Sequence, residues 1–173
     1  FVVVHKEDWD RLIQDRRAPN ELEYHLGWVS LPHGSMVRAI ILRPSETLRG
    51  SGDDLRTYFY CVLLADGEES FNITGRALSG RDFEDLGASP SEECYLALRV
   101  CGMGGRNSFD ICHATMEGSL RGGGCLSEEH RMDYNFPAPL SSTWEAAYAD
   151  DHCVIQRLKR SHLNSSYRYG DVD

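Results

Sequence analysis

The feature that most constrains the fold is a succession of short apolar runs, separated by turn-forming residues, that no long helical pattern interrupts. Short runs of aliphatic and aromatic residues bounded by Gly, Pro, Asn and Asp are typical of β-strands. Parallel strands need long, usually helical crossovers, so this pattern favours antiparallel pairing. We therefore predict an all-β fold, an antiparallel β-sandwich. The predicted strands are 26–31, 35–43, 58–64, 69–74, 94–101, 108–115, 131–136, 143–148 and 153–158.

The two ends of the chain depart from this pattern. Trp9, Leu12 and Ile13 recur at helical spacing before Pro19, so residues 6–17 are predicted to form a short amphipathic helix. Its apolar stripe suits packing on its own domain better than docking to a partner. The polar C-terminal end is predicted to be a tail or a linker to further sequence. The predicted domains are an N-terminal segment over 1–20, a β-sandwich over 21–160 and a polar tail over 161–173, with loops at 46–55 and 80–93.

Length and charge argue against several classes of protein. The 173 residues suit one domain, and 27 Asp and Glu against 18 Lys and Arg leave a net charge of −9. Phosphate binding needs a basic face, so this balance argues against a general binder of nucleic acid or of anionic membranes. The longest apolar run, residues 58–65, is far too short to cross a bilayer, so no membrane insertion is predicted.

Cysteines and glycosylation sequons indicate the secretory pathway. The six cysteines include no CxxC pair, which disfavours structural zinc, and no metal or cofactor is predicted. Two sequons make Asn72 and Asn164 predicted glycosylation sites, and the first residue is not Met. We predict a secreted protein whose cysteines form disulfides of undetermined connectivity. A cytosolic protein with buried thiols is the alternative. The candidate disulfide residues are Cys61, Cys94, Cys101, Cys112, Cys125 and Cys153.

Pairs of adjacent carboxylates are the first candidates for chemistry, because paired acids serve glycoside hydrolysis and bind calcium. They fall at predicted strand ends, where a solvated turn is the usual explanation. Cys112 and His113 are adjacent, and adjacent strand residues face opposite sides, which makes them poor nucleophile–base partners. Glycines at 102–105 and 122–124 are predicted to form hairpin turns. The sequence therefore predicts no enzyme. The acidic pairs are Asp53-Asp54, Glu68-Glu69, Glu92-Glu93, Glu128-Glu129 and Asp150-Asp151.

The order of several short motifs resembles the galectin domain. A Leu-Pro-His-Gly turn opens residues 31–38, and a Phe-Asn strand with a following Arg occupies 70–76. Residues 111–113 are similar to the Val-x-Asn strand of the family. Residues 126–131 and 135–137 are similar to its Trp-x-x-Glu-x-Arg strand and the Phe-Pro turn after it. The resemblance covers about residues 22–158 and implies a galectin-like jelly roll.

The galactose-binding residues of the family survive only in part. A galectin reads the sugar with His, Asn and Arg side chains above a Trp, whereas Leu126 stands at the Trp position and Ser70 at the His position. Aromatic stacking supplies much of such binding, and a glycan on Asn72 would fill the groove. The resemblance therefore implies a degraded sugar site. Its residues would be Asn72, Arg76, His113, Glu129 and Arg131.

A decayed galectin-like sandwich with several cysteines resembles the galectin-like domains of apicomplexan micronemal proteins. The resemblance implies a secreted, non-enzymatic module, found in micronemes and at the parasite surface, that supports host-cell attachment and invasion. Its implied partner is an adhesin ectodomain, such as a thrombospondin-type repeat. A glycan-binding lectin of altered specificity is the alternative, and an enzyme is the third.

Overall fold

The computed structural model describes residues 2–5 and 10–163. The chain forms two compact units, each assembled from two separate segments. Unit 1 consists of Phe1–Leu26 and Thr57–Phe109, and unit 2 consists of Gly27–Arg56 and Asp110–Asp173. Each unit is described by itself below.

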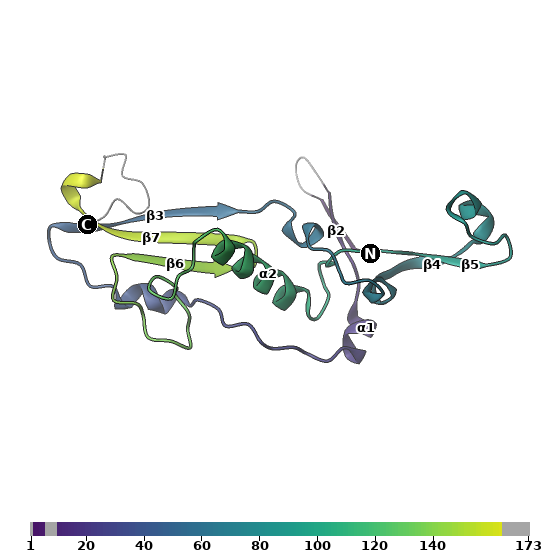
Figure 1. Ribbon diagram of the computed structural model, residues 1–173, viewed down its shortest axis with the longest axis horizontal. Helices are drawn as coiled ribbons and strands as arrows, with labels where there is room; N and C mark the ends of the chain where they lie inside the picture. The colour runs from purple at the N-terminus through teal and green to yellow at the C-terminus, as the bar shows by residue number, and fades with distance from the viewer. Residues whose placement is uncertain (1, 6–9, 164–173) are drawn as a thin grey trace. The chain divides into compact units, whose positions relative to one another are not determined.

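A three-stranded antiparallel sheet organises unit 2 (Figure 1). Strand β7 (Asp151–Lys159) lies in the middle, between β3 (Glu46–Asp54) and β6 (Thr143–Tyr148). β3 pairs with β7 along its whole length, from Glu46 opposite Lys159 to Asp54 opposite Asp151. β6 and β7 form a hairpin in which Tyr148 lies opposite Asp151. The remaining elements of this unit are the 3-10 helices η1 (Gly34–Ala39) and η5 (Arg160–His162) and most of helix α2 (Ser108–Gly122).

One face of this sheet carries the apolar core of unit 2. Met36 from η1, Met132 and Trp144 are buried and contact one another. Side chains alternate between the two faces of a strand, so Trp144 and Ala146 of β6 lie on the same face as Ile155 of β7. Leu48, Ile40 and Ala138 complete this cluster.

Unit 1 contains two short hairpins and several single-turn helices. β1 (Val2–His5) pairs with β2 (Asp10–Ile13), and β4 (Ile73–Ser79) pairs with β5 (Glu93–Ala97) across a register shift between Thr74 and Leu78. The helices are α1 (Arg17–Leu22), η2 (Tyr58–Cys61), η3 (Glu68–Asn72) and η4 (Gly80–Leu86).

The predicted antiparallel pairing is confirmed, because every strand pair of the described residues is antiparallel. The predicted strand 143–148 coincides with β6, and 153–158 lies within β7. Helices accompany the sheets, and the sandwich and its jelly-roll topology stay predictions.

Several individual predictions are wrong. Residues 108–115 lie in helix α2, where Cys112, His113 and Met116 are buried at the three- and four-residue spacing of a helix face. Segments 35–43 and 58–64 contain 3-10 helices in place of strands, and 26–31 belongs to no element. The opposite error occurs at 46–55, where the predicted loop is strand β3. β3 is polar and largely exposed, so its side chains give no local strand pattern. Its pairing with β7 holds it in the extended conformation.

The predictions for the two ends also need correction. Residues 10–13 form strand β2, and helix α1 begins later and includes Pro19, the residue predicted to end a helix. Trp9 and Asn164 lie outside the described residues, as does the predicted tail from 164 onward. The glycines at 102–105 form a turn, with the Gly105 N–H donating to the Gly102 carbonyl at 3.2 Å, but this turn leads into helix α2 and is not the predicted hairpin turn. No helix of the described residues is both long and apolar enough to span a membrane.

Candidate functional site

Three aspartates from two strand ends meet at one end of the unit 2 sheet. The β6–β7 hairpin reverses direction through residues 148–151, Tyr-Ala-Asp-Asp, which we call the acidic turn. Asp151 begins β7, and its register partner is Asp54, the last residue of β3. Asp150 occupies the turn itself. The strand pairing therefore brings together two acidic pairs that are almost one hundred residues apart in sequence.

The carboxylates of this turn affect one another electrostatically. Partial desolvation raises the pKa of Asp151, and the negative charges of Asp150 and Asp54 raise it further. Like charges held close together disfavour ionisation, so a cation placed among them relieves that repulsion.

Strand alternation separates Asp54 from its neighbour Asp53. Residues opposite one another in an antiparallel pair project to the same face, so Asp54 and Asp151 share one face while Asp53 shares the other with His152. The negative charge of Asp54 is one of the causes of the raised pKa of Asp151, and the charge of Asp53 is not. Asp54 is thus the member of its pair that belongs to the site.

Backbone hydrogen bonds hold the acidic turn on two sides. The Leu55 N–H donates to the Asp150 carbonyl at 3.1 Å and ties the turn to the end of β3. The Ala149 N–H donates to Nδ1 of His113, which α2 carries, at 3.1 Å. Ala149 has a φ of +51°, a left-handed conformation that non-glycine residues adopt only under constraint.

A buried polar network supports the hairpin. Glu145 of β6 is completely buried and accepts hydrogen bonds from the Leu126 N–H at 2.9 Å and from Nε2 of His152 at 3.2 Å. Arg131 contacts Glu117 at 2.7 Å and Asp133 at 3.0 Å. Charges buried in this way need partners, and these contacts provide them.

A pocket of about 400 Å³ lies beside Tyr148. His33 and Tyr134 contact each other there, edge to face, with ring centroids 5.4 Å apart. The pocket is open to solvent and combines aromatic rings with the polar side chains of Ser30 and Asn135. The same unit thus carries an aromatic recess next to its acidic turn.

The donor set of the turn suits a hard divalent cation, which prefers carboxylate oxygens. Among the residues that the structure describes, no group of three His, Cys, Asp or Glu side chains stands in place to hold a metal ion. Asp54 and Asp151 are exposed, so their side chains are free to rotate toward a cation. The features that suit a cation here are therefore the carboxylate chemistry and the backbone placement of Asp54 opposite Asp151.

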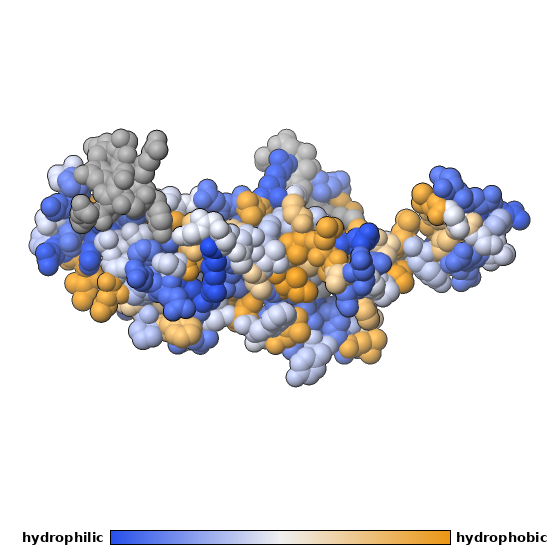
Figure 2. All heavy atoms as spheres, viewed as in Figure 1, coloured by the Kyte–Doolittle hydropathy of each residue, from blue (hydrophilic) through white to orange (hydrophobic). Residues whose placement is uncertain are grey.

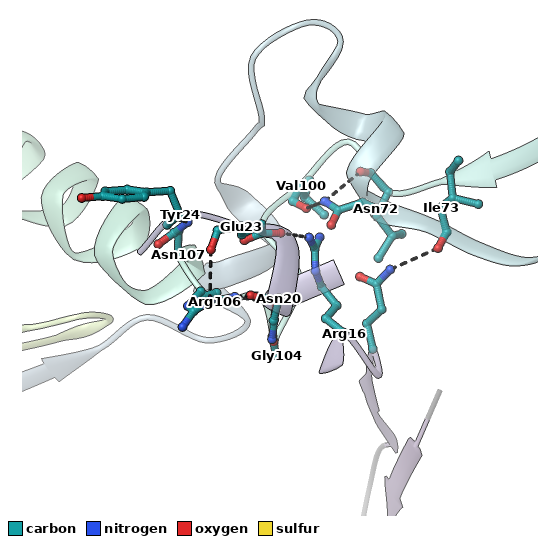
Figure 3. Close-up of polar contacts among 12 residues, drawn as sticks. Arg16, Asn20, Glu23, Tyr24, Asn72, Ile73, Val100, Gly104, Arg106 and Asn107 are labelled. Atoms are coloured by element: carbon teal, nitrogen blue, oxygen red, sulfur yellow. Dashed lines mark hydrogen bonds and ion pairs between the residues drawn. The ribbon is translucent and has the colours of Figure 1, made fainter. Parts of the chain in front are cut away.

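The residues predicted for a sugar site are divided between the two units. Asn72 of unit 1 is buried, and its amide donates to the carbonyls of Leu98 at 3.3 Å and Val100 at 3.1 Å (Figure 3). A glycan on this nitrogen would have to replace these bonds, although Asn72 stays a predicted glycosylation site. Arg76 is an exposed residue of β4 in the same unit.

The other three predicted sugar-site residues belong to unit 2. Glu129 is exposed in a turn, whereas His113 is buried on α2. Arg131 is half-buried and ion-paired with Glu117 and Asp133. Structural hydrogen bonds and ion pairs therefore occupy His113 and Arg131, which leaves Glu129 as the one exposed member of the three.

All six cysteines are present as thiols, so the disulfides stay a prediction. Cys101 and Cys112 are buried, and Cys61 is exposed. Burial raises the pKa of the Cys153 and Cys125 thiols, and the charges of Asp151 and Glu145 respectively add to this effect. These two thiols are therefore poor nucleophiles at neutral pH.

Sequence reasoning noticed Asp53-Asp54 and Asp150-Asp151 but assigned both pairs to solvated turns. The missing information was that β3 exists and that it pairs with β7. A usable signal was present, because Asp150 and Asp151 fall in the short polar stretch between the two predicted strands 143–148 and 153–158.

No family model and no curated protein matches this chain.

Proposed function

We propose that unit 2 catalyses phosphoryl transfer with divalent metal ions that Asp54, Asp150 and Asp151 hold. The observation that carries this proposal is the pairing of Asp54 with Asp151 next to Asp150, together with the raised pKa of Asp151 that the other two charges help to cause. Carboxylates grouped in this way are the usual ligands of metal pairs in polymerases, nucleases and phosphatases.

Divalent ions in such sites neutralise phosphate oxygens and activate an attacking hydroxyl or water. The protein's own part is to hold the three carboxylates at one edge. Asp54 and Asp151 face the same side of the sheet, so both can approach one cation. The Leu55 and Ala149 backbone bonds keep Asp150 next to them.

The recess beside the turn suggests a nucleotide or a nucleic-acid end as the substrate. Aromatic side chains provide stacking surfaces for nucleobases, and His33, Tyr134 and Tyr148 line this recess. The net charge of −9 opposes direct phosphate binding. Asp54, Asp150 and Asp151 would offset this charge locally if they held a divalent cation. Here the proposal departs from the sequence-based prediction of a non-enzyme without nucleic-acid partners.

The test combines metal binding with turnover. Mn²⁺ binding is measured by electron paramagnetic resonance, and Mg²⁺- or Mn²⁺-dependent nucleotidyl transfer is measured with a primer–template and nucleoside triphosphates, alongside phosphodiester hydrolysis. Asp54→Asn and Asp151→Asn are expected to lower Mn²⁺ affinity about 10- to 100-fold. Asp53→Asn is the matched control and is expected to retain wild-type affinity, since it faces the other side. Equal losses in Asp53→Asn and Asp54→Asn, or no Mn²⁺ binding by the wild type, would contradict the proposal.

A second candidate is the protein-interaction module that the galectin-like resemblance implies, with its jelly roll, secretion and adhesin partner. Exposed apolar residues favour it, and apolar atoms are visible on the surface in Figure 2. In unit 1, Leu22 at the end of α1 is 90% exposed and Tyr24 is 87% exposed; in unit 2, Trp28 is 62% exposed. Titration with a thrombospondin-type repeat tests this candidate. Binding that Trp28→Ala weakens and Asp54→Asn leaves unchanged would favour the module over the enzyme.

A further inference from the structure

The two-residue loop between β6 and β7 requires a positive φ at its first position, and Ala149, which is 2% exposed, adopts a φ of +51° there although it is not glycine. A left-handed non-glycine residue carries a conformational penalty, so contacts that hold it in place matter for the turn. The Leu55 N–H holds the Asp150 carbonyl from the β3 side. On the other side, the Ala149 N–H is buried and donates to a side chain, Nδ1 of His113.

His113 is well placed to hold this conformation. It lies on α2, and its side chain is 1% exposed. Nδ1 can accept the Ala149 N–H only when it carries no proton, so the remaining ring proton belongs to Nε2. Nε2 lies 3.6 Å from Oε1 of Glu117, the carboxylate that Arg131 holds. The buried ring therefore lies between the Ala149 amide and a carboxylate of its own helix.

The charged surroundings of His113 suit this acceptor role. Burial lowers its pKa, and Arg131 acts in the same direction. Glu117, the Ser30 backbone and Asp110 act in the opposite direction. The net effect is a lowered pKa, so the imidazole is neutral at physiological pH and Nδ1 is available to accept the bond.

We propose that His113 is a positioning residue for the acidic turn: by accepting the hydrogen bond from the Ala149 amide, it fixes the backbone from which Asp150 and Asp151 project toward Asp54. This inference rests on the proposed function only for its consequence in metal binding. The bond itself is a property of the fold. Residues behind a metal ligand commonly change affinity by about 10- to 100-fold when removed, because they orient the ligand.

The test uses His113→Ala and His113→Asn in the full chain. The Asn side-chain oxygen occupies nearly the position of Nδ1 and can accept the same N–H, whereas Ala cannot. Amide hydrogen exchange, resolved by NMR, reports the Ala149 bond directly. We expect the Ala149 amide to exchange about tenfold faster in His113→Ala, and His113→Asn to restore most of its protection. Mn²⁺ affinity is expected to follow the same order.

A matched control is His130→Ala, which removes an imidazole that bonds the Ser141 hydroxyl at 3.2 Å. It should leave both Ala149 exchange and Mn²⁺ affinity at wild-type values. Unchanged Ala149 exchange in a folded His113→Ala would overturn the inference. If that variant does not fold, a folded His113→Asn that loses Ala149 protection overturns it equally.

The two proposals fail in distinguishable ways. A wild-type protein that binds no Mn²⁺ contradicts the metal site, while the response of Ala149 exchange still decides the role of His113. If wild type and His113→Ala bind Mn²⁺ equally well, the metal site stands and the positioning role of His113 in metal binding is refuted.

Discussion

The buried polar side chains of the two units serve different ends. In unit 1, the buried Asn72 amide donates to the carbonyls of Leu98 and Val100 (Figure 3). These bonds join the end of η3 to the segment that follows β5. In unit 2, Glu145 and His113 hold backbone N–H groups at two residues with positive φ, Leu126 and Ala149. Buried polar side chains therefore mark a candidate site where they accept hydrogen bonds from residues with positive φ that lie next to carboxylates.

The largest expected effect concerns Glu145 in unit 2. Glu145→Ala leaves the buried Leu126 N–H and the His152 ring without their acceptor, so we expect a loss of about 3 kcal/mol in the free energy of unfolding. Urea denaturation measures it. Glu129→Ala, at an exposed position nearby in sequence, is the control and should change stability by less than about 0.5 kcal/mol. Equal effects of the two substitutions would remove the energetic basis of the comparison.

An intermediate effect is expected for Asn72 in unit 1. Asn72→Ala removes both donors to the Leu98 and Val100 carbonyls, and we expect a loss of about 1–2 kcal/mol, smaller than for Glu145 because no charged group loses its partner. The measurement is hydrogen exchange of the unit 1 amides. Since Asn72 has no contact with the acidic turn among the hydrogen bonds described here, Mn²⁺ affinity should not change. A fall in Mn²⁺ affinity would show that the two units are coupled.

The smallest effect is a pH dependence of unit 2. The pKa of His113 is lowered by burial from the ordinary value of 6.5, so the folded state binds fewer protons there than the unfolded state. That contribution to stability is fully present above pH 6.5 and is lost as the pH falls through the lowered pKa of the folded state. His113→Asn has no proton to bind, so its stability should fall less steeply between pH 7.5 and 5.5. Parallel stability curves for the two proteins would contradict this expectation.

Local sequence was sufficient where a strand carries its own apolar signal. Thr143–Tyr148 and the β7 run from Cys153 are rich in aromatic and β-branched residues, and their hairpin is local, so both could be predicted. β3 could not, because its residues are polar and include Gly50 and Gly52, and it is ordered through bonds to a strand about one hundred residues away. Over a window as short as 108–115, the apolar residues fit both the two-residue period of a strand and the 3.6-residue period of a helix. The structure has a helix there, which buries Cys112, His113 and Met116 on one face.

The candidate site divides in the same way. From sequence alone came the acidic pairs, the turn chemistry between β6 and β7 and the antiparallel pairing. Tertiary structure alone decided that Asp54 and not Asp53 faces Asp151, and that His113 accepts a bond from the turn. The physical reason is that side-chain period and turn preference are properties of neighbouring residues. Strand register and helix placement depend instead on which distant backbone groups find their hydrogen-bond partners, and no local pattern records that choice.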